Sequence, residues 1–143
     1  MVAGRNPVIG SVIDKYEVLQ KLGEGATATV YRGRHISIGK DVAIKVLASN
    51  YARNAALMRR FESEARIQAQ LRHPNIVAVH DFVRDGEING IVMDLVEGRS
   101  LDGVIHAHTG PMPAWRCIPL MMQVLEAIGY AHSRGVVHRD IKP

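Results

Sequence analysis

Short runs of apolar residues, set between polar positions and turn residues, dominate the first two thirds of the chain. Turn residues that separate runs of this length predict antiparallel β-strands. A polar turn near Gly39-Lys40 and a glycine at position 86 predict two of the connections between them. The five expected strands cover residues 16–19, 29–31, 42–47, 76–83 and 88–96.

Three other segments show the period of an α-helix. Residues 54–71 contain neither glycine nor proline, and their apolar positions, which are Leu57, Phe61, Ile67 and Leu71, recur at helical spacing. A short helix is predicted over residues 101–107 and a long one over residues 114–133. The long helix carries an apolar face so broad that it needs more protein against it than this chain holds. That face consists of Trp115, Ile118, Met122, Leu125 and Ile128.

The order of these elements predicts an α+β fold, in which a five-stranded antiparallel sheet and one helix are followed by further helices. We expect a leader over residues 1–15, a first lobe over residues 16–97 and the beginning of a helical lobe over residues 98–143. The composition, with 47% hydrophobic and 22% charged residues, is that of a folded protein. A length of 143 residues suffices for one domain, or one and a part.

Charge and cysteine content narrow the class of protein further. The net charge of +4 is scattered along the chain, which favours a solvated basic surface over a nucleic-acid site. A single cysteine, Cys117, excludes an internal disulfide and a cysteine-based metal cluster, and the histidines lack metal-ligand spacing. No segment resembles a signal peptide or a membrane span. We therefore expect a cytoplasmic location, although a longer parent can carry a membrane anchor downstream.

A glycine-rich segment joins the first two expected strands. Residues 22–30 are Leu-Gly-Glu-Gly-Ala-Thr-Ala-Thr-Val. Glycines let backbone N–H groups approach phosphate oxygens, because no side chain intervenes. In a dinucleotide-binding fold such a turn opens a helix, whereas here it leads into a strand. The pattern favours a phosphate-covering hairpin, and a glycine-rich hairpin without a ligand stays open as an alternative.

Lys45 lies within the apolar run over residues 42–47. A surface lysine on an edge strand is the ordinary explanation. On the helix over residues 54–71, however, Glu64 falls in the middle of an apolar stripe about 80° wide. A carboxylate that faces a core needs a partner. Lys45 is the natural candidate, and the pair would hold its ammonium group within reach of phosphates.

The last pattern is His138-Arg139-Asp140-Ile141-Lys142-Pro143, which taken alone could be a charged loop. It follows the glycine loop, the Val-Ala-Ile-Lys strand and the helix with its central glutamate, and in this order the set resembles the signature of protein kinases. Lys142 is typical of serine/threonine kinases, and the string from Arg60 to Ala65 is similar to bacterial members. The resemblance implies a kinase-like N-lobe, followed by a C-lobe that stops within the catalytic loop.

The resemblance implies a role for each matching position. The glycine loop would cover the phosphates of ATP, and Lys45, paired with Glu64, would contact the α- and β-phosphates. Asp140 would be the catalytic base, with Lys142 beside it, and Arg139 would pair with a phosphate on an activation loop. Val30 and Ala43 would lie against the adenine, Met93 at the back of its pocket, and Asp94 and Val96 would offer backbone groups to its edge. The implied ATP-binding residues are Leu22, Gly23, Glu24, Gly25, Ala26, Thr27, Ala28, Thr29, Val30, Ala43, Lys45, Glu64, Met93, Asp94 and Val96.

The implied reaction is transfer of a phosphoryl group from ATP, with Mg²⁺, to Ser and Thr hydroxyls of proteins, by a parent that can form a kinase dimer. Ala28 replaces a loop glycine, and Gln68 stands where the family has an apolar residue. The family's metal-binding asparagine and its Asp-Phe-Gly aspartate would follow Pro143, so we expect no metal ligand in this segment and no transfer by it alone. A pseudokinase, serving as a nucleotide-binding or scaffolding module, stays open, as does a short form that acts as a binding module.

Overall fold

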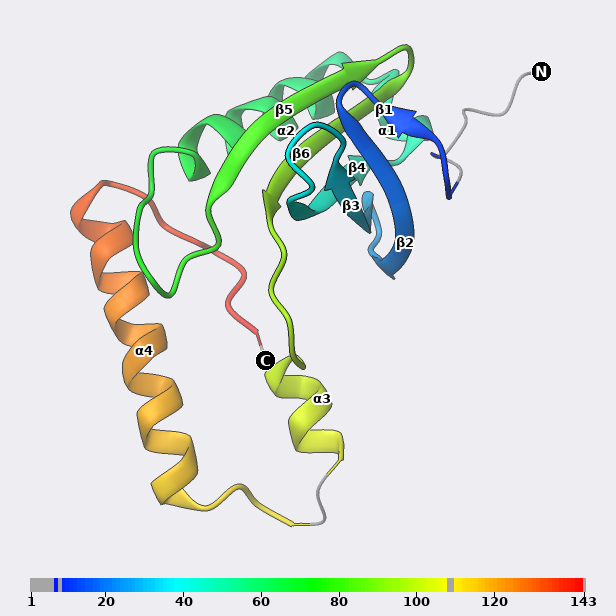
Figure 1. Ribbon diagram of the computed structural model, residues 1–143. Coiled ribbons are helices and arrows are strands. Elements are labelled where there is room, and N and C mark those ends of the chain that lie inside the picture. Colours follow the sequence, from blue (N-terminus) through cyan, green and yellow to red (C-terminus); the bar gives the residue numbers. More distant parts are fainter. Residues whose placement is uncertain (1–6, 8, 108–109, 143) are drawn as a thin grey trace. The chain divides into compact units, whose positions relative to one another are not determined.

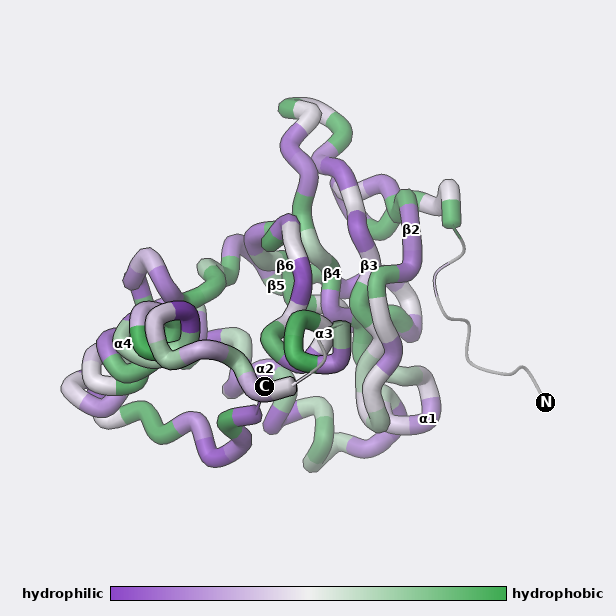
Figure 2. The backbone as a smooth tube through the Cα atoms, turned by 90° about the horizontal axis from the view of Figure 1, so that it is seen from below, coloured by the Kyte–Doolittle hydropathy of each residue, from purple (hydrophilic) through white to green (hydrophobic). Residues whose placement is uncertain are grey.

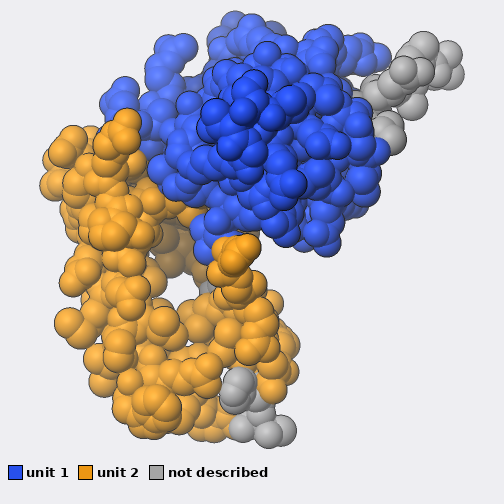
Figure 3. Space-filling model, in the orientation of Figure 1, with its two compact units in different colours: residues 1–70, 78–96 blue, residues 71–77, 97–143 orange. Residues whose placement is uncertain are grey.

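The computed structural model describes Pro7, residues 9–107 and residues 110–142. Contacts between Cα atoms divide the chain into two compact units (Figure 3). Unit 1 consists of residues 1–70 and 78–96, and unit 2 consists of residues 71–77 and 97–143. The expected domain boundary after residue 97 lies one residue beyond the end of unit 1. The assignment of residues 71–77 to unit 2 had no counterpart in the sequence pattern.

A curled antiparallel sheet of six strands forms most of unit 1, in the order β1-β2-β3-β4-β6-β5 (Figure 1). The strands are β1 Val12–Ile13, β2 Tyr16–Glu24, β3 Ala28–His35, β4 Asp41–Leu47, β5 Val79–Asp85 and β6 Ile88–Asp94. The sequence predicted five strands, and β1, which lies in the expected leader, is the sixth. Two residues are too few for a period of two to be visible, so pairing with β2 alone reveals this strand.

The sheet has a core on each face, as the alternation of side chains along its strands requires. In β4, Val42, Ile44 and Val46 are buried in one cluster with residues of β2, β3 and β6. Leu47, at the end of the same strand, belongs to a second cluster with Phe61 and Ala65 of a covering helix. Figure 2 shows the alternation of hydrophobic and hydrophilic positions along the backbone.

Side-chain contacts join the two edges of the sheet. Lys15, between β1 and β2, forms an ion pair of 2.7 Å with Asp81 of β5. The Tyr16 hydroxyl donates a hydrogen bond of 3.3 Å to the same carboxylate. Because β1 and β5 are the edge strands and contact each other, the curled sheet closes around its first core cluster. This closure depends on residues 66 positions apart and could not be inferred from local pattern.

Two helices follow β4: α1, Ser49–Ala52, and α2, Ala55–Gln68. The helix α2 begins where the sequence places it, because the Asn54 side chain accepts hydrogen bonds from the N–H groups of Ala56 and Leu57 at 3.0 and 3.2 Å. It ends three residues before the predicted Leu71. The four-residue helix α1 was not predicted, since a single turn has no measurable period.

Strand β5 begins three residues later than predicted, and β6 ends two residues earlier. The later start has a local cause, because the Ile76 N–H donates to the carbonyl of His73 and forms a turn within residues 71–77. The predicted hairpin between the two strands is confirmed, with Gly86 in its turn at a φ of 58°. Glycine, which has no Cβ, adopts such a φ without steric cost.

Unit 2 contains α3, Leu101–His106, and α4, Ala114–Ser133. The bounds of α4 agree with the prediction, and α3 ends one residue early. Gly135, at a φ of 74°, ends α4 through bonds from its own N–H and that of Val136 to carbonyls in the last turn. Segment 71–77 packs on α4, where the Tyr130 hydroxyl accepts from the Arg72 N–H at 3.2 Å. No helix in the described ranges is both long and apolar enough to cross a membrane.

Candidate active site

The predicted glycine hairpin is present between β2 and β3. Gly23 pairs with Val30 and Glu24 with Thr29, and residues 25–27 form the turn between the end of β2 and the start of β3. The Gly25 N–H donates a hydrogen bond of 2.8 Å to the Ala28 carbonyl across this turn. Residues 22–27 are exposed, while Ala28 and Thr29 are buried. The hairpin is therefore open to solvent along its tip and anchored in the sheet at its base.

The glycines of this hairpin are not explained by the protein's own packing. A Cβ atom at Gly23 would meet nothing within 4 Å, and one at Gly25 would meet only the Ala28 carbonyl oxygen at 3.4 Å. Neither residue has a positive φ. By contrast, a Cβ at Gly33 of β3 would lie 2.5 Å from the Cδ1 atom of Ile44. Gly33 is thus fixed by packing, whereas Gly23 and Gly25 leave space beside the hairpin that a ligand can occupy.

Lys45 of β4 and Glu64 of α2 form the predicted ion pair. The Lys45 Nζ lies 2.7 Å from the Glu64 Oε1, and it also lies 5.9 Å from the centroid of the Phe61 ring. The Lys45 side chain is 30% exposed. Strand β4 lies between β3 and β6 in the sheet, which rules out the edge-strand explanation for this lysine. The structure confirms the pairing on which the sequence argument rested.

The predicted burial of Glu64 is wrong, because its side chain is 52% exposed. The residues that α2 buries are Phe61 and Ala65. At 100° per residue, Glu64 lies about 80° from the middle of that buried face, at its edge. Ile67, also expected to be apolar core, is 43% exposed. The sheet packs against the small side chain of Ala65, which the sequence argument had not counted as part of the stripe.

Four of the predicted ATP-binding residues lie on one face of the sheet. Val30 pairs with Lys45 across β3 and β4, and Ala43 pairs with Met93 across β4 and β6. Partners directly across an antiparallel ladder share a face, as do Ala43 and Lys45, which are two residues apart. Met93 packs against the core cluster beneath α2. The register therefore places four of the residues predicted to bind ATP on the same face of the sheet.

Asp94, the last residue of β6, is held through its side chain. Its Oδ1 atom lies 2.6 Å from the His80 Nε2 and 3.3 Å from the Lys40 Nζ. The hydrogen bond from His80, and then that from Lys40, lower the pKa of this carboxyl despite partial desolvation. Val96, the final residue of unit 1, is 69% exposed. The backbone roles predicted for Asp94 and Val96 did not include either side-chain partner of Asp94.

Asp140 and Lys142 lie together near the end of unit 2. The Lys142 Nζ is 3.1 Å from the Asp140 Oδ2, and both side chains are more than 70% exposed, at 73% and 72%. The Asp140 N–H donates to the His138 Nδ1 at 3.2 Å. Arg139 has a φ of 64°, which is costly for a residue with a side chain. Residues held in such conformations cluster at functional sites.

Among the described residues, those predicted to bind ATP or to take part in catalysis form no metal cluster, and they do not line the pocket found in unit 1. In the part of the chain that the structure describes, no group of three or more His, Cys, Asp or Glu side chains is placed to hold a metal ion. A pocket of about 370 Å³ lies between α2 and β5, and its apolar lining residues are Ala65, Ala69, Val79 and Phe82. It is lined by none of the described residues assigned above to ATP.

Comparison with known proteins agrees with the geometry. Residues 16–143 match the model of the protein kinase domain. The chain is 40% identical over 129 residues to the serine/threonine-protein kinase PrkC of Bacillus subtilis, covering 90% of this chain and 20% of the relative. It is 39% identical over 140 residues to PknL of Mycobacterium tuberculosis, covering 97% of this chain and 35% of the relative. The chain thus spans about a third or less of these relatives.

Solved structures show the same fold. The crystal structure of the Mycobacterium tuberculosis PknI kinase domain superposes with a TM-score of 0.80 at 31% sequence identity, covering 96% of this chain and 56% of that one. A double mutant of the same domain gives a TM-score of 0.84 at 30% identity, with coverage of 97% and 55%. These similarities support the predicted arrangement of a sheet lobe followed by the first helices of a helical lobe.

Proposed function

Because the chain belongs to the protein kinase domain family, we propose that it forms the nucleotide-binding part of an enzyme that phosphorylates Ser and Thr hydroxyls of proteins with ATP. The observation that carries the proposal is the 2.7 Å ion pair between Lys45 and Glu64, on the sheet face that also bears Val30. An exposed surface pair contributes little to stability, so folding alone gives weak reason for a lysine there. Its use as a phosphate ligand supplies that reason.

Unit 1 holds the nucleotide in this proposal. The backbone of residues 23–27 approaches the phosphates, because no side chain fills the space beside Gly23 and Gly25. The Lys45 ammonium donates to phosphate oxygens, and Glu64 holds it in position from α2. Val30 and Ala43 provide apolar contact for the adenine, in front of Met93. The backbone groups of Asp94 and Val96 pair with the edge of the base.

Unit 2 supplies the residues that meet the substrate hydroxyl. The Asp140 carboxylate accepts the proton of the hydroxyl and orients its oxygen. Lys142, 3.1 Å from that carboxylate, carries a positive charge beside it. The left-handed backbone of Arg139 fixes the direction in which the adjacent Asp140 leaves the loop. Arg139 itself is proposed to pair with a phosphorylated activation loop.

Magnesium neutralises charge on the transferred phosphoryl group when it is bound. The family's metal-binding asparagine and its Asp-Phe-Gly sequence are not among these 143 residues. We therefore propose that the 143-residue chain binds ATP and does not transfer its phosphate. Incubation with labelled ATP, magnesium and a generic basic protein checks this, and label on the acceptor protein would contradict it.

The test of the nucleotide site compares ATP with adenosine as ligands for Lys45→Met. The substitution removes a charge-assisted contact to phosphate, so we expect ATP to bind about tenfold more weakly, which corresponds to about 1.4 kcal/mol. Adenosine, which has no phosphate, should bind as it does to the unaltered chain. Isothermal titration calorimetry measures both affinities.

The matched control is Lys15→Met. It removes a second lysine–carboxylate pair of unit 1, that of Lys15 with Asp81, which is also 2.7 Å long. Since this pair joins the sheet edges rather than facing the glycine hairpin, ATP affinity should stay unchanged. Equal losses in both variants, or an unaltered ATP affinity in Lys45→Met, would be incompatible with the proposed site.

A further inference from the structure

The end of β6 is the point at which the chain leaves the sheet. Asp94 is the last residue of that strand, and it pairs with Val42 of β4 on one side. On the other side its N–H donates a hydrogen bond of 3.0 Å to the Ala78 carbonyl, immediately before β5. Leu95 and Val96 follow without strand pairing. Whatever fixes Asp94 therefore fixes the origin of the segment that leads to Val96.

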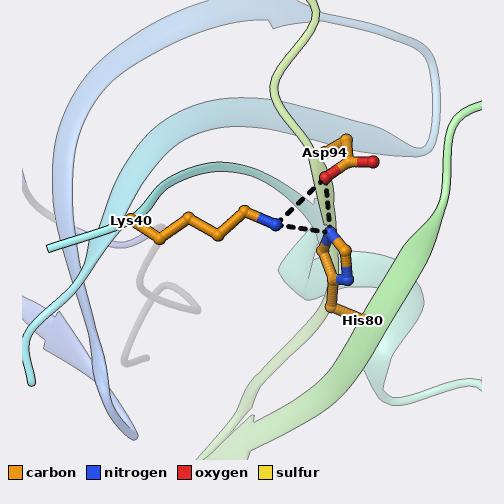
Figure 4. Close-up of polar contacts among 3 residues, drawn as sticks. All are labelled: Lys40, His80 and Asp94. Atoms are coloured by element: carbon orange, nitrogen blue, oxygen red, sulfur yellow. Dashed lines mark hydrogen bonds and ion pairs between the residues drawn. The ribbon is translucent and has the colours of Figure 1, made fainter. Parts of the chain in front are cut away.

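Two side chains hold the Asp94 carboxylate from the strands on either side of β6. Lys40 precedes β4, and His80 belongs to β5, while the sheet order places β6 between those two strands. Figure 4 shows both side chains pointing toward the same carboxylate, with contacts of 3.3 Å from Lys40 and 2.6 Å from His80 to Oδ1. The Lys40 Nζ and His80 Nε2 are themselves 3.3 Å apart. The three groups form one connected cluster.

The contact from His80 depends on an irregularity in the sheet. Val79 pairs with Met93 and Asp81 pairs with Val92. Met93 and Val92 are neighbours in β6, so His80 has no pairing partner there and forms a β-bulge in β5. A bulge of this kind redirects a side chain that would otherwise follow the alternation of the strand, and bulges recur beside functional sites. Here the bulge places the imidazole against Asp94, at the position where the chain leaves the sheet.

The chemistry of the cluster keeps it assembled at neutral pH. The carboxylate is ionised and offers lone pairs to two donors. Imidazole can donate from Nε2 in its neutral form as well as in its charged form, so the contact does not require protonated histidine. The side chains of His80 and Asp94 are only 34% and 44% exposed. Partial shielding from water makes the hydrogen bond of this pair stronger than that of a fully exposed pair.

We propose that His80 and Lys40 are positioning residues for the nucleotide. By holding the Asp94 carboxylate from both sides, they fix the backbone from Asp94 to Val96, to which the edge of the adenine binds. The inference rests on the proposed function, since it assigns the base to this segment. It differs from the role of Lys45, because it concerns the adenine end of the ligand and not the phosphates.

The first measurement needs no nucleotide. Amide hydrogen exchange at Asp94, whose N–H donates to the Ala78 carbonyl, should become faster in His80→Ala and in Lys40→Ala, because the residue loses one side-chain anchor in each. His80→Gln, whose amide can still donate to Asp94, should lie closer to the unaltered chain. Arg84→Ala is the control, since it removes the pair with Glu62 from the same strand but away from Asp94. Exchange at Asp94 should not change in that variant.

The second measurement is the affinity for adenosine and for ATP. We expect both ligands to bind about two- to fivefold more weakly in His80→Ala and Lys40→Ala, a size typical of partly exposed charged contacts. Equal losses for the two ligands distinguish these variants from Lys45→Met, which should weaken ATP alone. Affinities should be unchanged in Arg84→Ala.

The outcomes separate this inference from the proposed function. Unchanged exchange at Asp94 in His80→Ala and Lys40→Ala, or weakened binding in Arg84→Ala to the same extent, would overturn the positioning role. Normal adenosine affinity in both His80→Ala and Lys40→Ala would overturn it as well, while ATP binding that depends on Lys45 would leave the proposed function standing. If the unaltered chain bound neither ligand, the proposed function would fail, and the inference with it.

Discussion

Asp41 shows how strongly neighbouring side chains can change the pKa of a half-buried carboxyl. Its carboxylate accepts a hydrogen bond of 2.7 Å from the Arg34 Nε and another from Arg32. These bonds lower the pKa of Asp41 from 3.8 to about 2. Because the pKa of Asp41 is lower in the folded state, its hydrogen bonds with Arg34 and Arg32 contribute stability above pH 3.8. This stability is lost as the pH falls toward about 2. The start of β4 is thereby joined to β3 over the whole physiological range.

We expect Arg34→Ala to raise the pKa of the Asp41 carboxyl toward its ordinary value of 3.8, because the larger of the two hydrogen-bond contributions is removed. The measurement is an NMR titration of the carboxyl carbon. Arg53→Ala, which breaks the remote pair with Glu87, should leave the titration of Asp41 as it is. A midpoint that stays near 2 in Arg34→Ala would show that Arg32 alone suffices.

Individual residues also show where sequence reasoning succeeds. The partnership of Lys45 with Glu64 could be inferred, since a charged side chain in an apolar run and a carboxylate within a helical stripe each need an explanation. The exposure of Glu64 could not, because a helical wheel does not reveal which side of the stripe packs on the sheet. The role of His80 was invisible, because it depends on a bulge that only the pairing of β5 with β6 defines.

At the scale of elements, Gly23 and Gly33 of the β2–β3 hairpin have different roles. Gly33 is surrounded, since an added Cβ would lie 2.5 Å from the Ile44 Cδ1 and 3.1 Å from the Glu17 carbonyl oxygen. We expect Gly33→Ala to lower the free energy of unfolding by about 1–3 kcal/mol, as overpacking does. Urea denaturation measures the change. The contact with backbone oxygen limits relief by side-chain movement alone.

Gly23→Ala is the matched variant, because its added Cβ would meet nothing within 4 Å. Its free energy of unfolding should stay within about 0.5 kcal/mol of the unaltered chain. ATP affinity should fall, since the new methyl group occupies space beside the hairpin where phosphates are proposed to lie. A large loss of stability in Gly23→Ala, or none in Gly33→Ala, would contradict this division between ligand and packing.

Elements were predictable in proportion to their length. The twenty residues of α4 supply more than five helical turns, and the predicted and observed bounds coincide. The Asn54 cap likewise marks the start of α2 in the sequence. Strand β1 and helix α1, with two and four residues, are too short for a period to repeat and were missed. The start of β5 shifted because the turn bond from the Ile76 N–H to the His73 carbonyl competes with strand pairing there.

For the whole molecule, the two units differ in how much core they contain. Among the buried hydrophobic residues of the described part, Leu71 alone belongs to unit 2. All the others lie in unit 1, on the two faces of the sheet. The sequence indicated this contrast through the breadth of the apolar face on α4. It could not show that the sheet closes on itself through Lys15 and Asp81, because that contact spans most of unit 1.

The exposed face of α4 leads to a prediction about association. Trp115, Ile118, Met122 and Leu125 follow one another at helical spacing and are 77%, 56%, 57% and 66% exposed. Contiguous apolar surface of this kind promotes contact between molecules. We expect the 143-residue chain to associate as its concentration rises, which sedimentation velocity would detect. Leu125→Lys should reduce this association, because it places a charge in the middle of the apolar stripe.

The control for this effect is Glu126→Lys, which changes the charge of α4 by more while leaving the stripe intact. At 100° per residue, position 126 lies about 20° from Trp115, so the new charge stands beside the stripe but replaces none of its apolar side chains. If charge alone kept the molecules apart, Glu126→Lys would be at least as effective as Leu125→Lys. If the apolar stripe drives association, only Leu125→Lys should shift the sedimentation boundary toward the monomer, with the helical circular dichroism signal of both variants unchanged.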